Sequence, residues 1–251
     1  MIKEFFGFDG YMRTPEGYLS WQHLTFVTSL MAIMTLLAVA LGLRGRNKSD
    51  REKNRVLIAA AVTMDAFEIA KILLLCIFSD PMAWLNELPL YMCSIQLITL
   101  PLAAFAKGRL REAARDFVCI FGLLGAVLGT YGAGQNYACY PVISFNNVVS
   151  GITHSISGFA ALYIMIARMA SMKKRNIAVT FGIITFFSIA AFIANCILDT
   201  NYMFLMRGDG TPYDILYNLV SGNPVMYPLG VVVLFYAYIT TFTAVYRRVR
   251  R

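Results

Sequence analysis

Seven long apolar stretches, separated by short polar segments, constrain this chain more than any other feature. A helix needs about 20 mostly apolar residues to cross the hydrocarbon core of a membrane. Strands of a membrane barrel would be about half as long and would alternate in polarity. We therefore predict an all-α, polytopic bundle of seven transmembrane helices in a single domain over residues 1–251. The expected spans are 19–43, 56–78, 88–106, 114–131, 148–167, 177–198 and 226–245.

The composition excludes most other classes of protein. Hydrophobic residues make up 58% of the chain and charged residues only 14%, against roughly 25% charged residues in soluble domains. So few charges could not coat the surface of a soluble enzyme. The chain is equally unlike a disordered protein, a collagen or a disulfide scaffold.

The charges are sorted along the chain. Eighteen of the 22 Lys and Arg residues lie in the segments 44–55, 107–115, 168–175 and 247–251, which alternate with segments poor in basic residues. The positive-inside rule then places the N-terminus outside and the C-terminus inside the membrane. The net charge of +8 is thereby explained by topology. We expect membrane lipids as partners and no nucleic acid.

Charged residues within a predicted span need an explanation, because they are costly in a membrane. Asp65, Glu68 and Lys71 lie in the second span at spacings of three residues. Glu68 and Lys71 can form an ion pair along the helix. Either this pair locks the span against its neighbours, or a carboxylate faces a wet cavity.

The third span opens with the sequence LPLYMCSIQ, residues 88–96. Pro89 suits the first turn of a helix, and Cys93 and Gln96 then share a helix face. Cys93 is either a small buried hydrophobic residue or a nucleophile. A nucleophilic cysteine needs a base nearby to form the thiolate.

His154 in the fifth span is the best candidate for that base. Polar and small residues surround it at helical spacing: Asn147, Ser150, Gly151, Ser157, Gly158 and Ala161. A histidine on such a stripe faces protein or water. The alternative is a hydrogen bond between helices. In the fourth span, Gly122, Gly125 and Gly129 predict close helix packing.

The predicted orientation places seven polar residues in the outer half of the membrane or near its middle. One shared cavity, open to the outer face, would explain this placement. His23 has an alternative role as an interface anchor beside Trp21. The seven residues are His23, Glu68, Cys93, Gln96, His154, Asn195 and Asp199.

Short motifs in this order resemble the YwaF-type integral membrane proteins of Gram-positive bacteria and mycoplasmas. They are QHL at 22–24, LPLYMC at 88–93, His154, NYMFL at 201–205 and, weakly, YPL at 227–229. The family often has histidine where this chain has Tyr91, which removes one candidate base. The resemblance implies a multi-pass protein of a bacterial plasma membrane. We include Tyr91 and Tyr202, from these motifs, among the expected substrate-binding residues.

The YwaF-type family is similar, more remotely, to eukaryotic transmembrane acyltransferases and hydrolases of the androgen-induced type. Those enzymes use a nucleophile and a histidine within the membrane. The resemblance implies Cys93 and His154 as their counterparts.

An enzyme acting on lipid acyl esters is therefore our first hypothesis. Cys93 would attack the ester and His154 would move the proton. Gln96 or Asn195 could donate to the oxyanion, and Glu68 or Asp199 could orient the imidazole. The remaining expected substrate-binding residue is His23.

Two other classes of function stay open. The same pocket could bind a small solute in a transporter or sensor, or the polar groups could serve only for packing. The chain has two histidines and no CxxC spacing, so we expect neither a metal site nor a cofactor.

Overall fold

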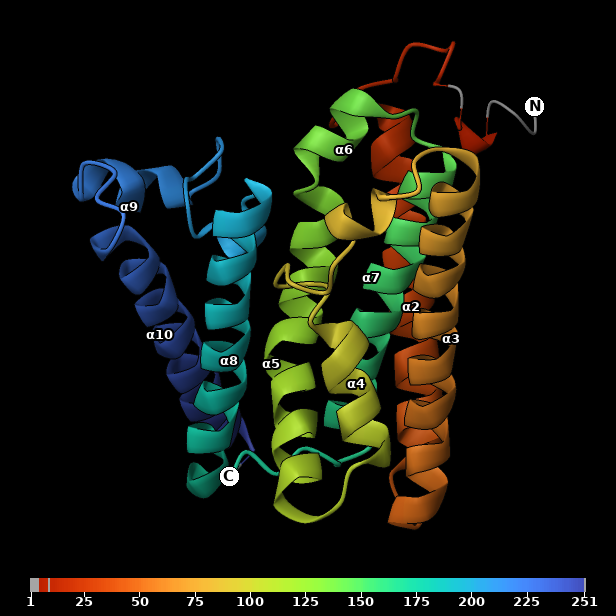
Figure 1. The fold of residues 1–251 in the computed structure, drawn as a ribbon. Helices are drawn as coiled ribbons and strands as arrows, with labels where there is room; N and C mark the ends of the chain where they lie inside the picture. Colours follow the sequence, from red (N-terminus) through yellow and green to blue (C-terminus); the bar gives the residue numbers. More distant parts are fainter. Residues whose placement is uncertain (1–4, 9, 251) are drawn as a thin grey trace.

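The computed structural model describes residues 5–8 and 10–250, and these residues form helices and connecting turns without a β-strand (Figure 1). Lys3, Glu4, Asp9 and Arg251, which contribute to the charge pattern, lie outside the described residues. The elements are α2 (Trp21–Gly45), α3 (Asp50–Phe78), η1 (Ala83–Asn86), α4 (Gln96–Phe105), α5 (Gly108–Tyr131), α6 (Gly134–Cys139), α7 (Phe145–Ile166), α8 (Lys174–Leu198), η2 (Tyr202–Phe204), α9 (Tyr213–Leu219) and α10 (Met226–Val249).

Serine residues cap several of the long helices at their N-termini. Ser20 accepts a hydrogen bond from the backbone N–H of His23 at the start of α2. Ser49 and Glu52 form a complete capping box at the start of α3. Such caps satisfy backbone donors that have no partner inside the helix, and they fix where these helices begin.

Among the described residues, five helices are long and apolar enough to cross a membrane: α2, α5 (with α6), α7, α8 and α10. Their bounds follow the predicted spans 19–43, 114–131, 148–167, 177–198 and 226–245 closely. The helical, apolar architecture of a membrane protein is thus confirmed. The second predicted span corresponds to α3, which has 29 residues but carries internal charges.

The prediction of a helix over residues 88–106 is wrong for its first half. Residues 88–95 form turns, and α4 has only ten residues, about 15 Å of helix. The hydroxyl of Ser94 explains the difference locally. It accepts from the backbone N–H of Tyr91 at 3.0 Å and donates to the Tyr91 carbonyl at 3.1 Å, which closes a turn instead of a helix.

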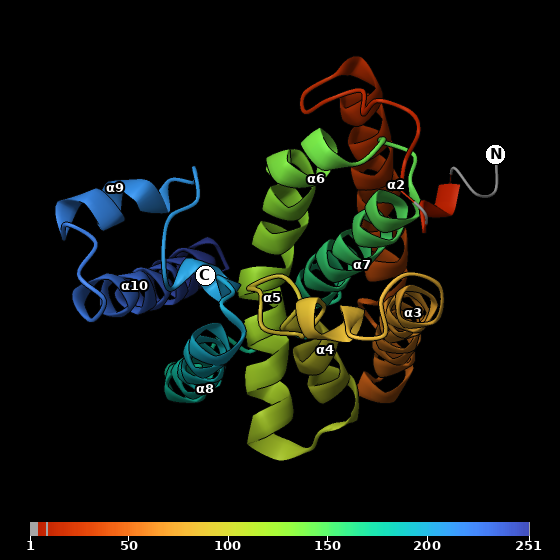
Figure 2. The ribbon, with the colours of Figure 1, turned by 45° about the horizontal axis from the view of Figure 1, so that its top comes forward.

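Helix α5 lies at the centre of the bundle (Figures 1 and 2). It packs against α4 and α7 and also against α8, which stands with α10 and α9 on the other side. A Cβ at Gly122 would lie 2.9 Å from the carbonyl oxygen of Ser157 on α7. A Cβ at Gly158 would lie 2.7 Å from the Cβ of Ala126. The predicted close approach of these helices is confirmed.

The fold gathers the basic segments at one end of the bundle, the lower end in Figure 1. Arg115 pairs with Asp50 at 2.8 Å and Lys173 with Glu112 at 3.0 Å. Arg250 donates to the carbonyl oxygen of Ala170 at 3.0 Å. These contacts join all four segments, as the charge pattern predicts. The side of the membrane that this end faces stays a prediction.

Candidate functional site

Cys93 lies in the turns that precede α4, against the central helix α5. A Cβ at Gly125 of α5 would be 3.5 Å from the Cβ of Cys93. The thiol of Cys93 and the imidazole of His154 interact electrostatically, and Nε2 of His154 makes no regular hydrogen bond. The two residues that the sequence singles out therefore lie against the same face of α5, Cys93 at Gly125 and His154 at Gly129.

In the imidazole of His154, one ring nitrogen forms a hydrogen bond and the other has no hydrogen-bond partner. Nδ1 is 2.7 Å from the backbone carbonyl oxygen of Ser150, one helical turn earlier. A carbonyl only accepts, so the hydrogen-bond network assigns the proton to Nδ1. Nε2 is buried and makes no hydrogen bond of regular geometry. In the neutral ring, Nε2 is thus the nitrogen that can accept the thiol proton.

Gly129 has no side chain, which leaves room for the imidazole of His154 to pack against α5. A Cβ at this position would lie 1.9 Å from Cδ2 and 2.1 Å from Nε2 of His154. Carbon atoms in contact are normally about 3.5–4.0 Å apart. Any side chain at position 129 would therefore push the ring away. Gly125 and Gly129 are four residues apart and share one face of α5, so Cys93 packs against Gly125 and His154 packs against Gly129.

A group of three charges joins α3 to the residue that precedes the 88–93 motif. The Nζ atom of Lys71 is 2.6 Å from Oε1 of Glu68 and 2.8 Å from Oε2 of Glu87. The predicted Glu68–Lys71 pair is confirmed, and Glu68 also interacts electrostatically with His154. Sequence reasoning missed Glu87, although it directly precedes the 88–93 motif. Through Glu87, Lys71 ties the segment that carries Cys93 to α3.

Gln96, at the start of α4, contributes an unused hydrogen-bond donor. The residue is 1% exposed, and its Oε1 accepts from the hydroxyl of Thr99 at 3.0 Å. Its Nε2 is buried without a partner. Buried donors of this kind are rare and call for an explanation. Gln96 lies three residues after Cys93, and its Nε2 is the buried side-chain donor without a partner that is closest to the thiol in the described sequence.

The hypothesis of one cavity shared by all seven polar residues is wrong, because three of them lie elsewhere in the fold. His23 joins α2 to α5. Its Nε2 is 3.1 Å from the carbonyl oxygen of Thr130, and its Nδ1 accepts from the backbone N–H of Leu19. Both ring nitrogens are occupied, so the structure gives His23 a packing role.

Asn195 and Asp199 belong to the α8–η2 connection. Asn195 accepts from the backbone N–H of Tyr202 at 2.7 Å and donates to its carbonyl at 3.1 Å. It also accepts from Thr200. Asp199 is exposed at the end of α8. The amide of Asn195 is therefore already used in holding this loop, and the carboxylate of Asp199 faces outward.

Tyr202 and Tyr91 bring the α8–η2 connection to the segment that carries Cys93. Their ring centroids are 4.8 Å apart in an edge-to-face arrangement. The Tyr202 hydroxyl donates to the carbonyl oxygen of Leu85. Tyr202 is fully buried, whereas Tyr91 is 39% exposed. Of the two, only Tyr91 presents surface to a ligand.

Comparison with protein families now bears on these residues. The model of the TMEM164 family matches residues 18–244. The chain belongs to the TMEM164 family. The match includes every candidate site residue, from His23 to Tyr202, and it supports a membrane protein. It names a different family from the YwaF-type proteins that the motifs predict. No curated protein and no solved structure matches the sequence.

The site of this TMEM164-family chain combines a thiol, an imidazole with one fixed proton and a free amide donor. The described residues contain no cluster of three or more His, Cys, Asp or Glu side chains suited to a metal ion. The arrangement can carry out nucleophilic attack by sulfur with proton transfer to nitrogen.

Proposed function

We propose that this protein transfers or hydrolyses acyl groups of membrane lipids through a Cys93–His154 pair. The observation that carries the proposal is that Cys93 and His154 lie against the same face of α5, at Gly125 and Gly129, with Nδ1 of His154 bound to the Ser150 carbonyl. A fixed tautomer directs the basic nitrogen of a catalytic histidine toward its nucleophile.

The first half-reaction forms a thioester. Nε2 of His154 takes the thiol proton while the sulfur of Cys93 bonds to the ester carbonyl carbon. The tetrahedral intermediate then collapses, the carbon–oxygen bond of the ester breaks, and the imidazolium gives its proton to the leaving alcohol. His154 returns to its neutral form with the acyl group on Cys93.

The second half-reaction releases the acyl group. His154 takes a proton from an incoming hydroxyl, whose oxygen attacks the thioester carbonyl. The carbon–sulfur bond breaks and the thiolate regains the proton from the imidazolium. Water as the acceptor makes the protein a hydrolase, and a lipid hydroxyl makes it an acyltransferase.

Gln96 is our candidate for the oxyanion donor. Its Nε2 is buried and unpaired, while the amide of Asn195, the other expected donor, is used in the α8–η2 connection. Donors aimed at the developing charge commonly supply the largest share of rate enhancement. Glu68 supports the imidazolium through its electrostatic interaction with His154.

The proposal includes seven spans, with α3 as the second and residues 88–106 as a third that is helical only in its inner half. Irregular backbone at membrane depth is tolerated where protein surrounds it. The positive-inside pattern supports an outer N-terminus, and the YwaF-type resemblance supports the plasma membrane of a bacterium.

The test uses p-nitrophenyl palmitate as an activated acyl donor for the full chain in detergent micelles. We expect release of p-nitrophenol to fall at least about 100-fold in Cys93→Ala and in His154→Gln, the usual scale for loss of general base catalysis. Cys196→Ala, at an exposed cysteine of α8, is the matched control and should keep full activity. Undiminished release by Cys93→Ala would overturn the proposal and favour a solute-binding role.

A further inference from the structure

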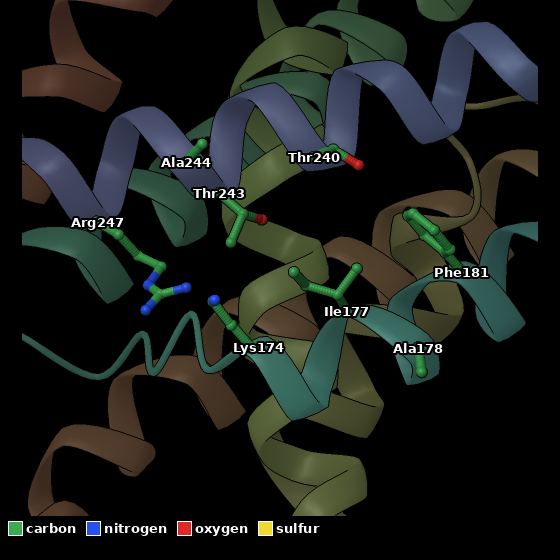
Figure 3. Close-up of a pocket in the computed structure, with 8 residues that line it drawn as sticks. All are labelled: Lys174, Ile177, Ala178, Phe181, Thr240, Thr243, Ala244 and Arg247. Carbon is green, nitrogen blue, oxygen red and sulfur yellow. The ribbon is translucent and has the colours of Figure 1, made fainter.

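A cavity of about 460 Å³ lies between α8 and α10, where the basic segments 168–175 and 247–251 adjoin the two helices. Figure 3 shows the side chains that line it, which come from the first two turns of α8 and the last turns of α10. We call it the α8–α10 groove. Its main lining residues are Lys174, Ile177, Ala178, Phe181, Thr243 and Arg247.

The two cations of the groove have no carboxylate partner among the described residues. Figure 3 shows the ammonium group of Lys174 and the guanidinium of Arg247 extending toward one another at one end of the groove. In contrast to Lys174, its neighbours in the chain, Lys173 and Arg175, both form ion pairs with Glu112. Two like charges that face each other without a counterion repel, and a bound anion would relieve this repulsion.

The rest of the groove is mainly apolar. Ile177, Ala178 and Phe181 form one side, and the ring of Phe181 stacks on Tyr236 with centroids 4.3 Å apart. Residues 240–247 of α10 line the other side over about 10 Å at 1.5 Å per residue. Apolar residues elsewhere on both helices are exposed, such as Ile193 and Val233. The two helices thus present a surface suited to acyl chains.

We propose that the α8–α10 groove binds an anionic glycerophospholipid. Its phosphate lies between Lys174 and Arg247, and one acyl chain runs along Ile177 and Phe181. Basic pockets between transmembrane helices at the cytoplasmic surface favour anionic headgroups. A zwitterionic lipid fits less well, because its own cation opposes the two protein cations. This site does not depend on the proposed chemistry of Cys93.

The test places a fluorescent reporter in the groove. The chain has two tryptophans, both at exposed positions away from the groove, Trp21 and Trp84. Each is replaced by phenylalanine, and Phe181→Trp is introduced as an aromatic exchange. The full-length protein is reconstituted in phosphatidylcholine vesicles that contain a fixed fraction of acyl-chain-brominated phosphatidylglycerol or brominated phosphatidylcholine. Bromine quenches tryptophan only at close range, so quenching reports which acyl chain occupies the groove.

We expect brominated phosphatidylglycerol to quench more strongly, with a relative affinity about thirty-fold above phosphatidylcholine, because each of the two basic side chains favours a headgroup of net negative charge. Lys174→Gln with Arg247→Gln should remove the preference. The exchange Lys174→Arg with Arg247→Lys should keep it, which separates loss of charge from loss of folding.

The matched control removes two charges outside the groove, as Lys48→Gln with Arg248→Gln, and should retain the preference. Equal quenching by the two lipids would overturn the proposal. An equal loss of preference in the control would also overturn it, because the effect would then belong to surface charge in general. Absence of quenching by either lipid would mean that another occupant, such as a second copy of the chain, covers the groove.

Discussion

Replacing Gly129 with alanine tests the geometry of the site without touching either reactive group. A methyl group at this position would lie 1.9 Å from Cδ2 and 2.1 Å from Nε2 of His154. Since carbon contacts begin near 3.5 Å, the ring must move by about 1.5 Å. The basic nitrogen of His154 would then move away from the position that the proposed proton transfer from Cys93 requires.

The expected loss can be estimated from that displacement. A misplacement of about 1 Å at a reacting group can cost about 100-fold in rate. We therefore expect Gly129→Ala to lower kcat/KM by at least about 100-fold, or about 2.7 kcal/mol in transition-state stabilisation. Gly125→Ala is the matched control, because its methyl group would meet Cys93 at an ordinary 3.5 Å. It should keep activity within a few-fold.

Two assays read out this pair of variants. Hydrolysis of p-nitrophenyl palmitate measures turnover. The rate of Cys93 alkylation by iodoacetamide, followed by peptide mass spectrometry, measures thiolate formation without any assumption about the substrate. Both rates should fall in Gly129→Ala and persist in Gly125→Ala. Full activity and full alkylation in a folded Gly129→Ala variant would refute the role assigned to the imidazole.

Three further predictions concern stability, each measured as Tm in detergent. Asn195→Ala leaves the backbone of Tyr202 without two partners, so it should cost about 1–3 kcal/mol per unpaired group and lower Tm. Lys71→Met leaves the buried Glu68 and the partly exposed Glu87 without their cation, so it should cost about 3–5 kcal/mol, whereas Lys71→Arg should cost less. The hydrogen bond from Arg115 holds the pKa of Asp50 below its ordinary value of 3.8. The stabilisation from ionised Asp50 is present above pH 3.8 and is lost as the pH falls through the lowered pKa. Asp50→Asn should therefore lower Tm at neutral pH and make the fall of Tm in acid less steep. An unchanged acid profile in Asp50→Asn would contradict the assignment.

Hydropathy and charge were sufficient to locate most of the helices. The predicted stretches at 177–198 and 226–245 end within a few residues of α8 and α10, because continuous apolar sequence leaves a membrane helix few alternatives. The same criterion failed at residues 88–95. That segment is apolar, but the turn made by Ser94 and the ion pair between Glu87 and Lys71 depend on side-chain contacts that hydropathy does not contain.

The site was predictable to the extent that residue type and membrane depth define it. Depth predicted that Cys93 and His154 are neighbours, and the structure places both against α5, where the glycine spacing indicated close packing. Membrane depth alone does not show which helices a side chain contacts. The prediction therefore grouped His23 and Asn195 with Cys93 and His154, although both form hydrogen bonds elsewhere in the fold. The orienting partner of His154 is a backbone carbonyl, which carries no signature in the sequence.

Detection of an acyl group on Cys93 tests the central proposal most directly. The full-length protein is exposed to p-nitrophenyl palmitate, quenched in acid and analysed by peptide mass spectrometry. The account predicts a palmitoyl thioester on Cys93 that hydroxylamine removes, with little of it in His154→Gln. Turnover of the ester with no acyl group on Cys93, or acylation that is undiminished in His154→Gln, would contradict it.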